Sequence, residues 1–315
     1  MIKDGFIKGV RTGGMLLRVM LPIYVVVVFL KYTPIIPFMQ ERLAPAMRVF
    51  SLPGDAAVPI VAGIFSDEYG VAAAMSGFDF TTAQITTIAM IILCFHTIPL
   101  EAAIGYQIGF HPAKYTLYRF VLAVATGLFV GWLAGLMYDG GAGHAALQNA
   151  SDSAGGAEIL TASGEFVWGQ LRTMLSEMLW GSLSVVLSLA RVIIPLMIVI
   201  EFILSYKLVE RFALKLGSYR RLLGISEDAL LPLLVGLLMG VTYGAGTLME
   251  INKRTPLSTR DFTLIGVFLY ACHGIIETSI LFAVAGGGVF FFCVVRLLIA
   301  TLITAVAARL PRFAK

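Results

Sequence analysis

Charged side chains are scarce in this 315-residue sequence, since Asp, Glu, Lys and Arg together make up only 13% of it. Hydrophobic residues make up 58%, and the mean hydropathy is +0.89. Soluble domains carry about 25% charged residues, so this composition excludes a chain of one or two soluble domains. The long apolar runs instead predict an all-α polytopic membrane protein, because in a single chain of this kind helices satisfy their own backbone hydrogen bonds within the bilayer.

Cysteine is also scarce, and the three present have no CxxC spacing. Cys94, Cys272 and Cys293 all lie in apolar runs, so we expect buried free thiols. The sequence lacks a P-loop, a GxGxxG motif in a strand–helix context, and a pattern of nucleophile, base and orienting group. These absences predict a protein that is not an enzyme and that needs no cofactor.

A large excess of basic charge is missing too, because the net charge is only +4. The basic residues cluster beside apolar runs, which is typical of residues that orient a protein in the membrane. We therefore expect membrane lipid as a partner and no nucleic acid. A homo-oligomer is compatible with the sequence.

The sequence contains an internal repeat. One set of matching residues is separated by 173 positions and a second set, further along, by 177 positions. The first set pairs Arg18 with Arg191, Asp55 with Asp228, Pro59 with Pro232 and Gly63 with Gly236, and the second pairs Thr82 with Thr259, His96 with His273 and Arg119 with Arg296. Residues 1–138 and 180–315 are therefore interpreted as two copies of one unit, joined by an extracytoplasmic linker and an amphipathic segment at 139–179.

Each copy is expected to contain three transmembrane helices and one re-entrant hairpin. The first helices are predicted at 15–38 and 183–206, and the hairpins at 55–75 and 228–249, where Pro and Gly interrupt the helical pattern. The linker 139–170 has no Lys or Arg, whereas basic residues follow the first helix of the second copy and end the chain. This charge pattern places both termini in the cytoplasm of a bacterium and predicts inverted repeats in its cytoplasmic (inner) membrane.

Two similar segments carry ionisable residues inside apolar runs: His96 with Glu101, and His273 with Glu277. Such side chains are costly within a bilayer unless they have a partner, water or a ligand. His273 and Glu277 are spaced to share a helix face, and a kink at Pro99 is expected to bring Glu101 to the face of His96. If the two halves fold alike and face each other, all four are expected to converge near one axis. They are candidates there for substrate binding, ion binding or proton coupling, and the alternative is that they only pair within the helix bundle.

The tips of the two hairpins supply further candidates for a binding site, because discontinuous segments expose backbone groups to a ligand. The alternative is that their polarity only satisfies bent backbone. These candidates are Ser66, Asp67, Glu68 and Tyr69 in the first copy, and Thr242 and Tyr243 in the second. Arg119 and Arg296 lie near predicted helix ends, where we expect their side chains to reach the lipid head groups.

The chain resembles membrane proteins that carry the nucleoside-recognition, or Gate, domain. The resemblance rests on the doubled pattern Leu52-Pro53-Gly54-Asp55 through Gly63, and Ile225-Ser226-Glu227-Asp228 through Gly236, each followed by a polar helix. Relatives include concentrative nucleoside transporters, the membrane part of the ferrous-iron transporter, and spore maturation proteins. The resemblance implies inverted repeats and passage of a small solute, although the hairpin tips lack the cysteine expected of the iron transporter.

Three functions agree with these observations. The first is a proton-coupled, alternating-access transporter of a small polar solute, nucleoside-like or similar, because histidine titrates near neutral pH. The second is a divalent-metal transporter, since two imidazoles and two carboxylates, from His96, Glu101, His273 and Glu277, suit zinc, manganese or ferrous iron. The third is a non-transporting membrane scaffold that needs a partner protein.

Overall fold

The computed structural model describes residues 21–107, 111–138, 168–184, 216–241 and 257–310, with isolated positions at 7, 187, 191, 194–195 and 198–199. Every regular element in these ranges is a helix. Three helices, Thr82–Ala103, Pro112–Tyr138 and Thr259–Val284, are long and apolar enough to cross a membrane, and a bent pair adds a fourth if it counts as one span. Within the described residues, the prediction of an all-helical, membrane-spanning chain is confirmed.

The bent pair corrects the prediction of one continuous helix over 15–38. A helix over Leu21–Lys31 is followed, after a turn at residues 32–34, by α2 (Ile35–Arg48), and the two differ in direction by 89°. Pro34 precedes α2, and a residue before proline disfavours helical backbone, so the break lies where the sequence contains Thr33-Pro34. Lys31 at the end of the first helix pairs with Glu177 at 2.8 Å, which attaches this end to the segment that follows residue 167.

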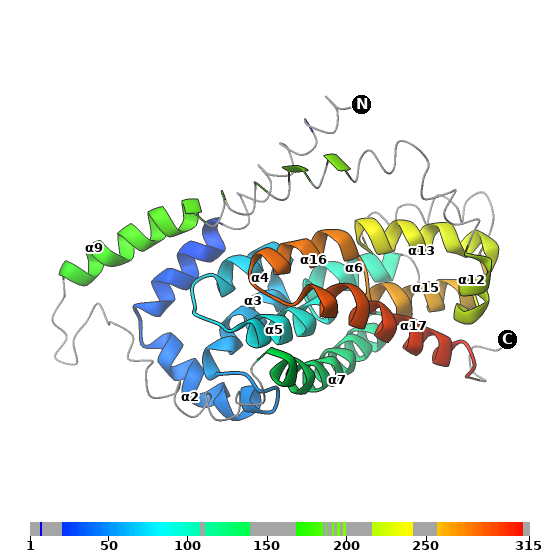
Figure 1. Ribbon diagram of the computed structural model, residues 1–315, viewed down its shortest axis with the longest axis horizontal. Helices are drawn as coiled ribbons and strands as arrows, with labels where there is room; N and C mark the ends of the chain where they lie inside the picture. Colours follow the sequence, from blue (N-terminus) through cyan, green and yellow to red (C-terminus); the bar gives the residue numbers. More distant parts are fainter. Residues whose placement is uncertain are drawn as a thin grey trace.

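That later segment consists of α9 (Trp168–Ser176) and a π-helical turn, η2 (Glu177–Gly181). In Figure 1, α9 lies at the same end of the molecule as α2. The rest of the predicted linker, residues 139–167, lies outside the described residues, as do most of the predicted helix over 183–206 and the end of the second hairpin.

The first predicted hairpin consists of two short helices. After the 3₁₀ turn η1 (Gly54–Ala56), α3 (Ala57–Phe65) ends at Ser66, and α4 (Glu68–Met75) begins after Asp67, whose side chain accepts a hydrogen bond from the Gly70 N–H. In the second half, α12 (Gly217–Leu223) is followed by α13 (Glu227–Met239), which corresponds to α3. The structure describes the second predicted hairpin as far as residue 241.

Both helices that carry the histidines are broken at the histidine. The first consists of α5 (Thr82–Cys94) and α6 (Ile98–Gln107), and the second of α15 (Thr259–Ala271) and α16 (Ile275–Val284). Each pair begins with a hydroxyl cap, from Thr81 on the Gln84 N–H and from Ser258 on the Asp261 N–H. Each pair is followed by a further helix: α7 (Pro112–Tyr138) after the first, and a π-turn η3 (Phe291–Val295) leading into α17 (Arg296–Ala307) after the second.

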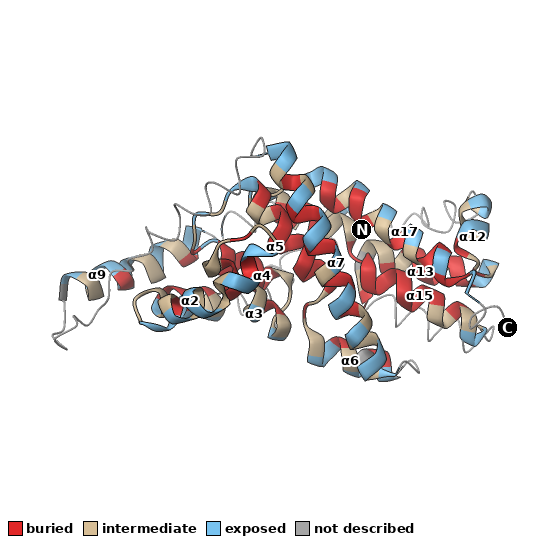
Figure 2. Cartoon of the chain, turned by 90° about the horizontal axis from the view of Figure 1, so that it is seen from below, coloured by how far each residue is buried: buried red, intermediate tan, exposed pale blue. Residues whose placement is uncertain are grey.

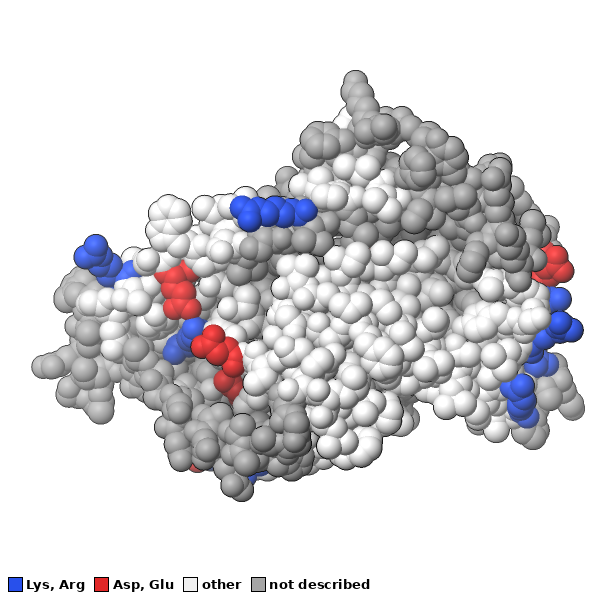
Figure 3. Space-filling view, in the orientation of Figure 1, with Lys and Arg blue, Asp and Glu red and all other residues white. Residues whose placement is uncertain are grey.

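The core of the molecule lies where α5, α7, α13, α15 and α17 face one another, and Figure 2 shows buried residues concentrated on these sides. The outer faces of α7 and α17 instead present large apolar side chains, among them Phe120, Trp132, Leu298 and Leu302, each more than half exposed. Figure 3 shows a wide face without charged side chains between charged groups at the two ends. Such a surface fits contact with lipid.

Close approach of α7 to the loop after α2 gives a test of this packing. A methyl group on Gly131 would lie 2.3 Å from the Phe50 carbonyl oxygen, whereas one on Gly135, a turn later in α7, would meet nothing within 4 Å. Replacing either glycine by alanine favours the helix by about 1 kcal/mol. We therefore expect Gly131→Ala to lower the melting temperature of the detergent-purified protein, and Gly135→Ala to leave it unchanged or raise it; equal shifts in the two would contradict this packing.

Candidate functional site

His96 and His273 lie in the two helix breaks, and their side chains are held in the same way. His96 is 2% exposed and His273 is 4% exposed. The Nδ1 of His96 lies 2.8 Å from the carbonyl oxygen of Ile92, and the Nδ1 of His273 lies 2.7 Å from that of Leu269. Because a carbonyl oxygen only accepts, each Nδ1 carries the proton, and each Nε2 of a neutral ring is left with a lone pair.

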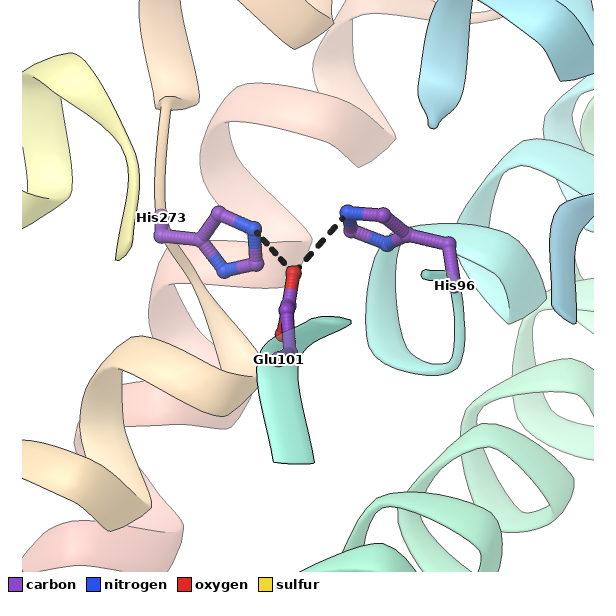
Figure 4. Close-up of side chains that lie close together, drawn as sticks. All are labelled: His96, Glu101 and His273. Carbon is purple, nitrogen blue, oxygen red and sulfur yellow. Dashed lines mark ion pairs between the residues drawn. The ribbon is translucent and has the colours of Figure 1, made fainter. Parts of the chain in front are cut away.

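The two imidazole rings face each other across Glu101. Their centroids are 5.4 Å apart, and Figure 4 shows the Glu101 carboxyl between them. The Oε1 atom of Glu101 lies 3.3 Å from Nε2 of His96 and 3.7 Å from Nε2 of His273. Of the four residues predicted from the sequence to converge, the structure thus brings together three: His96, Glu101 and His273.

Two buried arginines donate hydrogen bonds to the backbone at the breaks. Arg119 of α7 donates from Nε to the Cys94 carbonyl and from Nη2 to the His96 carbonyl, both at 2.9 Å. Arg296 of α17 donates from Nε to the Ala271 carbonyl at 3.2 Å. The two side chains are 2% and 1% exposed, so the prediction that they reach the lipid head groups is wrong. They bind carbonyl groups that the broken helices leave without an intrahelical partner.

The equivalent hydrogen bonds show which residues correspond between the two breaks. Arg119 Nη1 pairs with Glu101 Oε2 at 2.8 Å, and Arg296 Nη1 donates to Thr278 Oγ1 at 2.9 Å. The Glu101 N–H donates to the Thr97 carbonyl, as the Thr278 N–H does to the Gly274 carbonyl. Thr278 therefore takes the place of Glu101 in the second half, and the prediction that Glu277 is its counterpart is wrong.

The predicted kink at Pro99 is also wrong. The first helix breaks before Pro99, which lies in the first turn of α6, where a proline costs no hydrogen bond. Thr97 has φ +47°, and its counterpart Gly274 has φ +56°, so the backbone adopts the left-handed conformation at the same place in both breaks. Since the second break contains no proline, the geometry depends on the left-handed residue and the arginine, and not on Pro99.

Each break is also held by a hydrogen bond to an earlier helix, α3 for the first break and α13 for the second. The N–H of Thr97 donates to the Gly63 carbonyl at 2.9 Å, and that of Gly274 donates to the Gly236 carbonyl at 3.3 Å. A methyl group on Gly63 would lie 2.5 Å from Ile92, and one on Gly236 would lie 2.6 Å from Leu269. The two glycines allow α3 and α13 to approach the breaks closely enough for these hydrogen bonds.

The four candidate residues at the tip of the first hairpin have different roles around this site. Asp67 caps α4, and the Ser66 carbonyl accepts a hydrogen bond from the Thr97 hydroxyl, so these two support the local backbone. Glu68 reaches the cluster, with Oε2 3.4 Å from His96 Nε2. The Tyr69 hydroxyl donates to Glu277 Oε1 and so joins α4 to α16. Thr242 and Tyr243, predicted for the second tip, lie outside the described residues.

Sequence reasoning did not identify Arg119, Arg296 and Tyr270 as site residues. Tyr270 donates from its hydroxyl to the Glu101 carbonyl at 3.2 Å, and its ring lies 5.2 Å from the Arg119 guanidinium carbon. Arginine at the same position in both copies was a usable signal, since a membrane helix seldom carries this residue twice by chance. No comparable signal marked Tyr270, because Leu93 occupies the corresponding position in the first copy.

Comparisons with known proteins agree with the two-part organisation. A family model described as Gate, nucleoside recognition, matches residues 15–114 and 186–287. An uncharacterized membrane protein of Bacillus subtilis strain 168, YvoD, is 27% identical over 305 residues, which cover 95% of this chain and 91% of that protein. No solved structure matches the chain. The two matched segments include both histidines, Glu68 and Glu101.

The arginine contacts give a prediction about stability. Replacing Arg296 by glutamine leaves buried carbonyl groups in a broken helix without donors, so we expect a loss of about 3–5 kcal/mol. Arg48→Gln, at the exposed C-terminal end of α2, is the control and is expected to change stability by less than about 0.5 kcal/mol. Thermal unfolding of both variants in detergent measures this, and similar melting temperatures would show that Arg296 does not support the break.

Proposed function

The chain belongs to the family of membrane proteins with the Gate, or nucleoside-recognition, domain, and from this premise we propose that it carries a small polar solute across the cytoplasmic membrane of a bacterium. The observation that carries the proposal is the meeting of two broken helices at one buried cluster of ionisable side chains. Ionisable groups within membrane helices are costly and usually mark the path of a substrate, an ion or a proton. The proposal makes this chain a carrier and not an enzyme.

The proposed architecture is a pair of inverted repeats, each with three membrane crossings and one re-entrant hairpin, and with both termini in the cytoplasm. The recurrence of the same hydrogen bonds around His96 and His273 supports two copies of one unit. In transporters of this kind, discontinuous helices meet near the middle of the bilayer, where the substrate binds. The two breaks correspond to such helices, and contact between α4 and α16 connects the two halves there.

The proposed mechanism is alternating access. His96, Glu101 and His273 are nearly inaccessible to water, so the conformation described here is closed around them. A transporter needs at least one further conformation in which this cluster faces water on one side of the membrane. A non-transporting scaffold needs none, so opening of the cluster distinguishes the two functions.

In the proposed coupling, protons enter and leave the cluster through Nε2 of each histidine and through Glu101. Both Nε2 atoms face the same carboxylate oxygen, so a proton taken up by one ring changes the interaction of the other ring with Glu101. Arg119 remains on the other oxygen, Oε2, and holds the carboxyl in place. One carboxyl thus connects the protonation of both helix breaks.

Replacing His273 by glutamine tests this coupling. We expect proteoliposomes with His273→Gln to lose at least about 90% of the uptake that an imposed pH gradient drives, an effect of the size seen when a proton-transfer group is removed. Radiolabelled uridine and adenosine are the first probes, and His111→Gln, at the exposed start of the α7 segment, is the control. Unchanged gradient-driven uptake in His273→Gln would refute the coupling.

Labelling of two native cysteines tests whether the cluster becomes accessible to water. Cys94 and Cys272 adjoin the breaks and are 2% and 0% exposed, so a small hydrophilic thiol reagent should label them slowly in the closed conformation. We expect labelling, followed by mass spectrometry, to become at least about 10-fold faster when a pH gradient is applied, because opening exposes the cluster. The Cys94→Ser/Cys272→Ser variant gives the background, and labelling at the same slow rate with and without the gradient would favour a scaffold.

A further inference from the structure

We propose that His96, His273 and Glu101 form a binding site for a divalent cation of the first transition row, such as Zn²⁺, which competes there with protons. The donors are Nε2 of the two histidines and Oε1 of Glu101, and Oε2 of Glu68 lies beside them, 3.4 Å from His96 Nε2. The inference rests on the proposed function in one respect: the cation is taken to be the ion that the cluster exchanges during transport.

The spacing of the donors is the first argument. Ligands about 2.0–2.1 Å from a tetrahedral metal ion lie about 3.3–3.4 Å from one another. His96 Nε2 lies 3.3 Å from Glu101 Oε1 and 3.4 Å from Glu68 Oε2, and His273 Nε2 lies 3.7 Å from Glu101 Oε1. Charge-assisted hydrogen bonds between nitrogen and a carboxylate are about 2.7–2.9 Å long, so these contacts are too long for such bonds. The 3.3 Å distance between His96 Nε2 and Glu101 Oε1 matches an edge of a coordination shell, and the donors of His96, Glu101 and His273 all lie within 4.8 Å of one another.

The orientation of the donors is the second argument. Both histidines use Nδ1–H to bind a backbone carbonyl, which directs the lone pair of each Nε2 toward Glu101. Metal-bound histidines are commonly held in this way, because the second ring nitrogen then fixes the ring and its tautomer. Arg119 similarly binds Oε2 of Glu101 and leaves Oε1 for the cluster. The donor atoms are thus oriented before any ion binds.

Convergence of lone pairs is costly unless a positive charge lies between them. With neutral rings, Nε2 of His96, Nε2 of His273 and Oε1 of Glu101 all present electron pairs to the same small space, within 4.8 Å of one another. In a buried site, this repulsion is little screened by solvent. A metal cation relieves it at all three atoms together, whereas one proton forms a hydrogen bond between only two of them.

The charges around the cluster also favour a divalent ion. Glu68 is close enough to Glu277, Asp67 and Glu101 to be repelled by all three. Against these four carboxyl groups stand the guanidinium groups of Arg119 and Arg296, which leaves an excess of two negative charges when all are ionised. A bound divalent cation would balance this excess, and a buried site strongly favours such balance.

The donor set selects the kind of metal. Two imidazole nitrogens and one carboxylate oxygen suit Zn²⁺, Mn²⁺ or Fe²⁺, whereas Ca²⁺ and Mg²⁺ prefer shells made only of oxygen. Cys94 and Cys272 adjoin the histidines along the chain, but their sulfurs are not among the converging donors. We therefore expect a borderline ion, and not one that requires thiolate.

An optical titration with Co²⁺ tests the site without any transport assay. The detergent-purified, full-length protein is stripped with a chelator, and Co²⁺ is added at neutral pH. We expect one equivalent to bind with the strong visible absorption of four-coordinate Co²⁺, and Zn²⁺ to displace it. Glu101→Gln and His273→Gln are each expected to weaken binding at least about 10-fold, since each removes one donor.

Glu277→Gln and His111→Gln are the matched controls for these variants. Glu277 binds Tyr69 and is not among the converging donors, so its replacement removes a neighbouring charge but no ligand, and it is expected to weaken Co²⁺ binding less than the replacement of Glu101 or His273 does. Size-exclusion profiles in detergent show which variants are folded. Absent Co²⁺ binding in the folded wild-type protein, or equal binding in Glu101→Gln and Glu277→Gln, would overturn the inference.

The two proposals fail in different ways. If Co²⁺ binds but no solute or ion crosses proteoliposome membranes, the metal site is upheld and the transport function is refuted. If gradient-driven uptake is measured but folded protein binds no Co²⁺, transport is upheld and the cluster carries protons alone. Binding that weakens as the pH falls is expected in addition, because metal and protons occupy the same donors.

Discussion

The structure depends on one constraint, that a helix broken inside a membrane must find donors for its free carbonyl groups. Each unsatisfied group costs several kcal/mol where water is absent. Arg119 and Arg296 supply these donors, one for each break, from the helix that follows in the chain. Their guanidinium groups are suited to this task, because the charge persists at all relevant pH values and several N–H groups point in fixed directions. Each of the two histidines, His96 and His273, lies within one of these breaks.

Sequence reasoning predicted the helical membrane character, the repeat and the convergence of His96, Glu101 and His273, because charge, proline and glycine patterns are readable along the chain. It did not predict where each helix breaks. Pro99 suggested a kink, yet the break depends on Thr97 in a left-handed conformation. Threonine seldom adopts this conformation, and no sequence pattern predicts it. It also paired Glu101 with Glu277 by residue type, whereas the backbone pairs Glu101 with Thr278. Chemical likeness was a poorer guide than the spacing of 177 residues, which relates both histidines and both arginines.

The arginines connect the two halves as well as supporting each one. Arg119 hydrogen-bonds to groups of its own half, at Cys94, His96 and Glu101, and its guanidinium group also lies over the ring of Tyr270 in the other half. Arg296 extends Nη2 to the Leu93 carbonyl of the other half, at 3.4 Å. A motion that separates the halves therefore weakens a contact of each arginine. The support of both breaks accordingly changes with the arrangement of the two halves.

The cluster is asymmetric at Thr278, the position that corresponds to Glu101, where a second glutamate would destabilise the buried site. A glutamate in place of Thr278 would put a second carboxyl beside Arg296, and the repulsion between two buried carboxylates would oppose the approach of the breaks. Threonine accepts the arginine hydrogen bond without adding charge. Among the residues that the structure describes, Glu101 is then the one acidic group that contacts both imidazoles, while Glu68 contacts His96. Two equivalent breaks thus share a single carboxyl, so binding at one histidine changes the electrostatic environment of the other without any movement of the backbone.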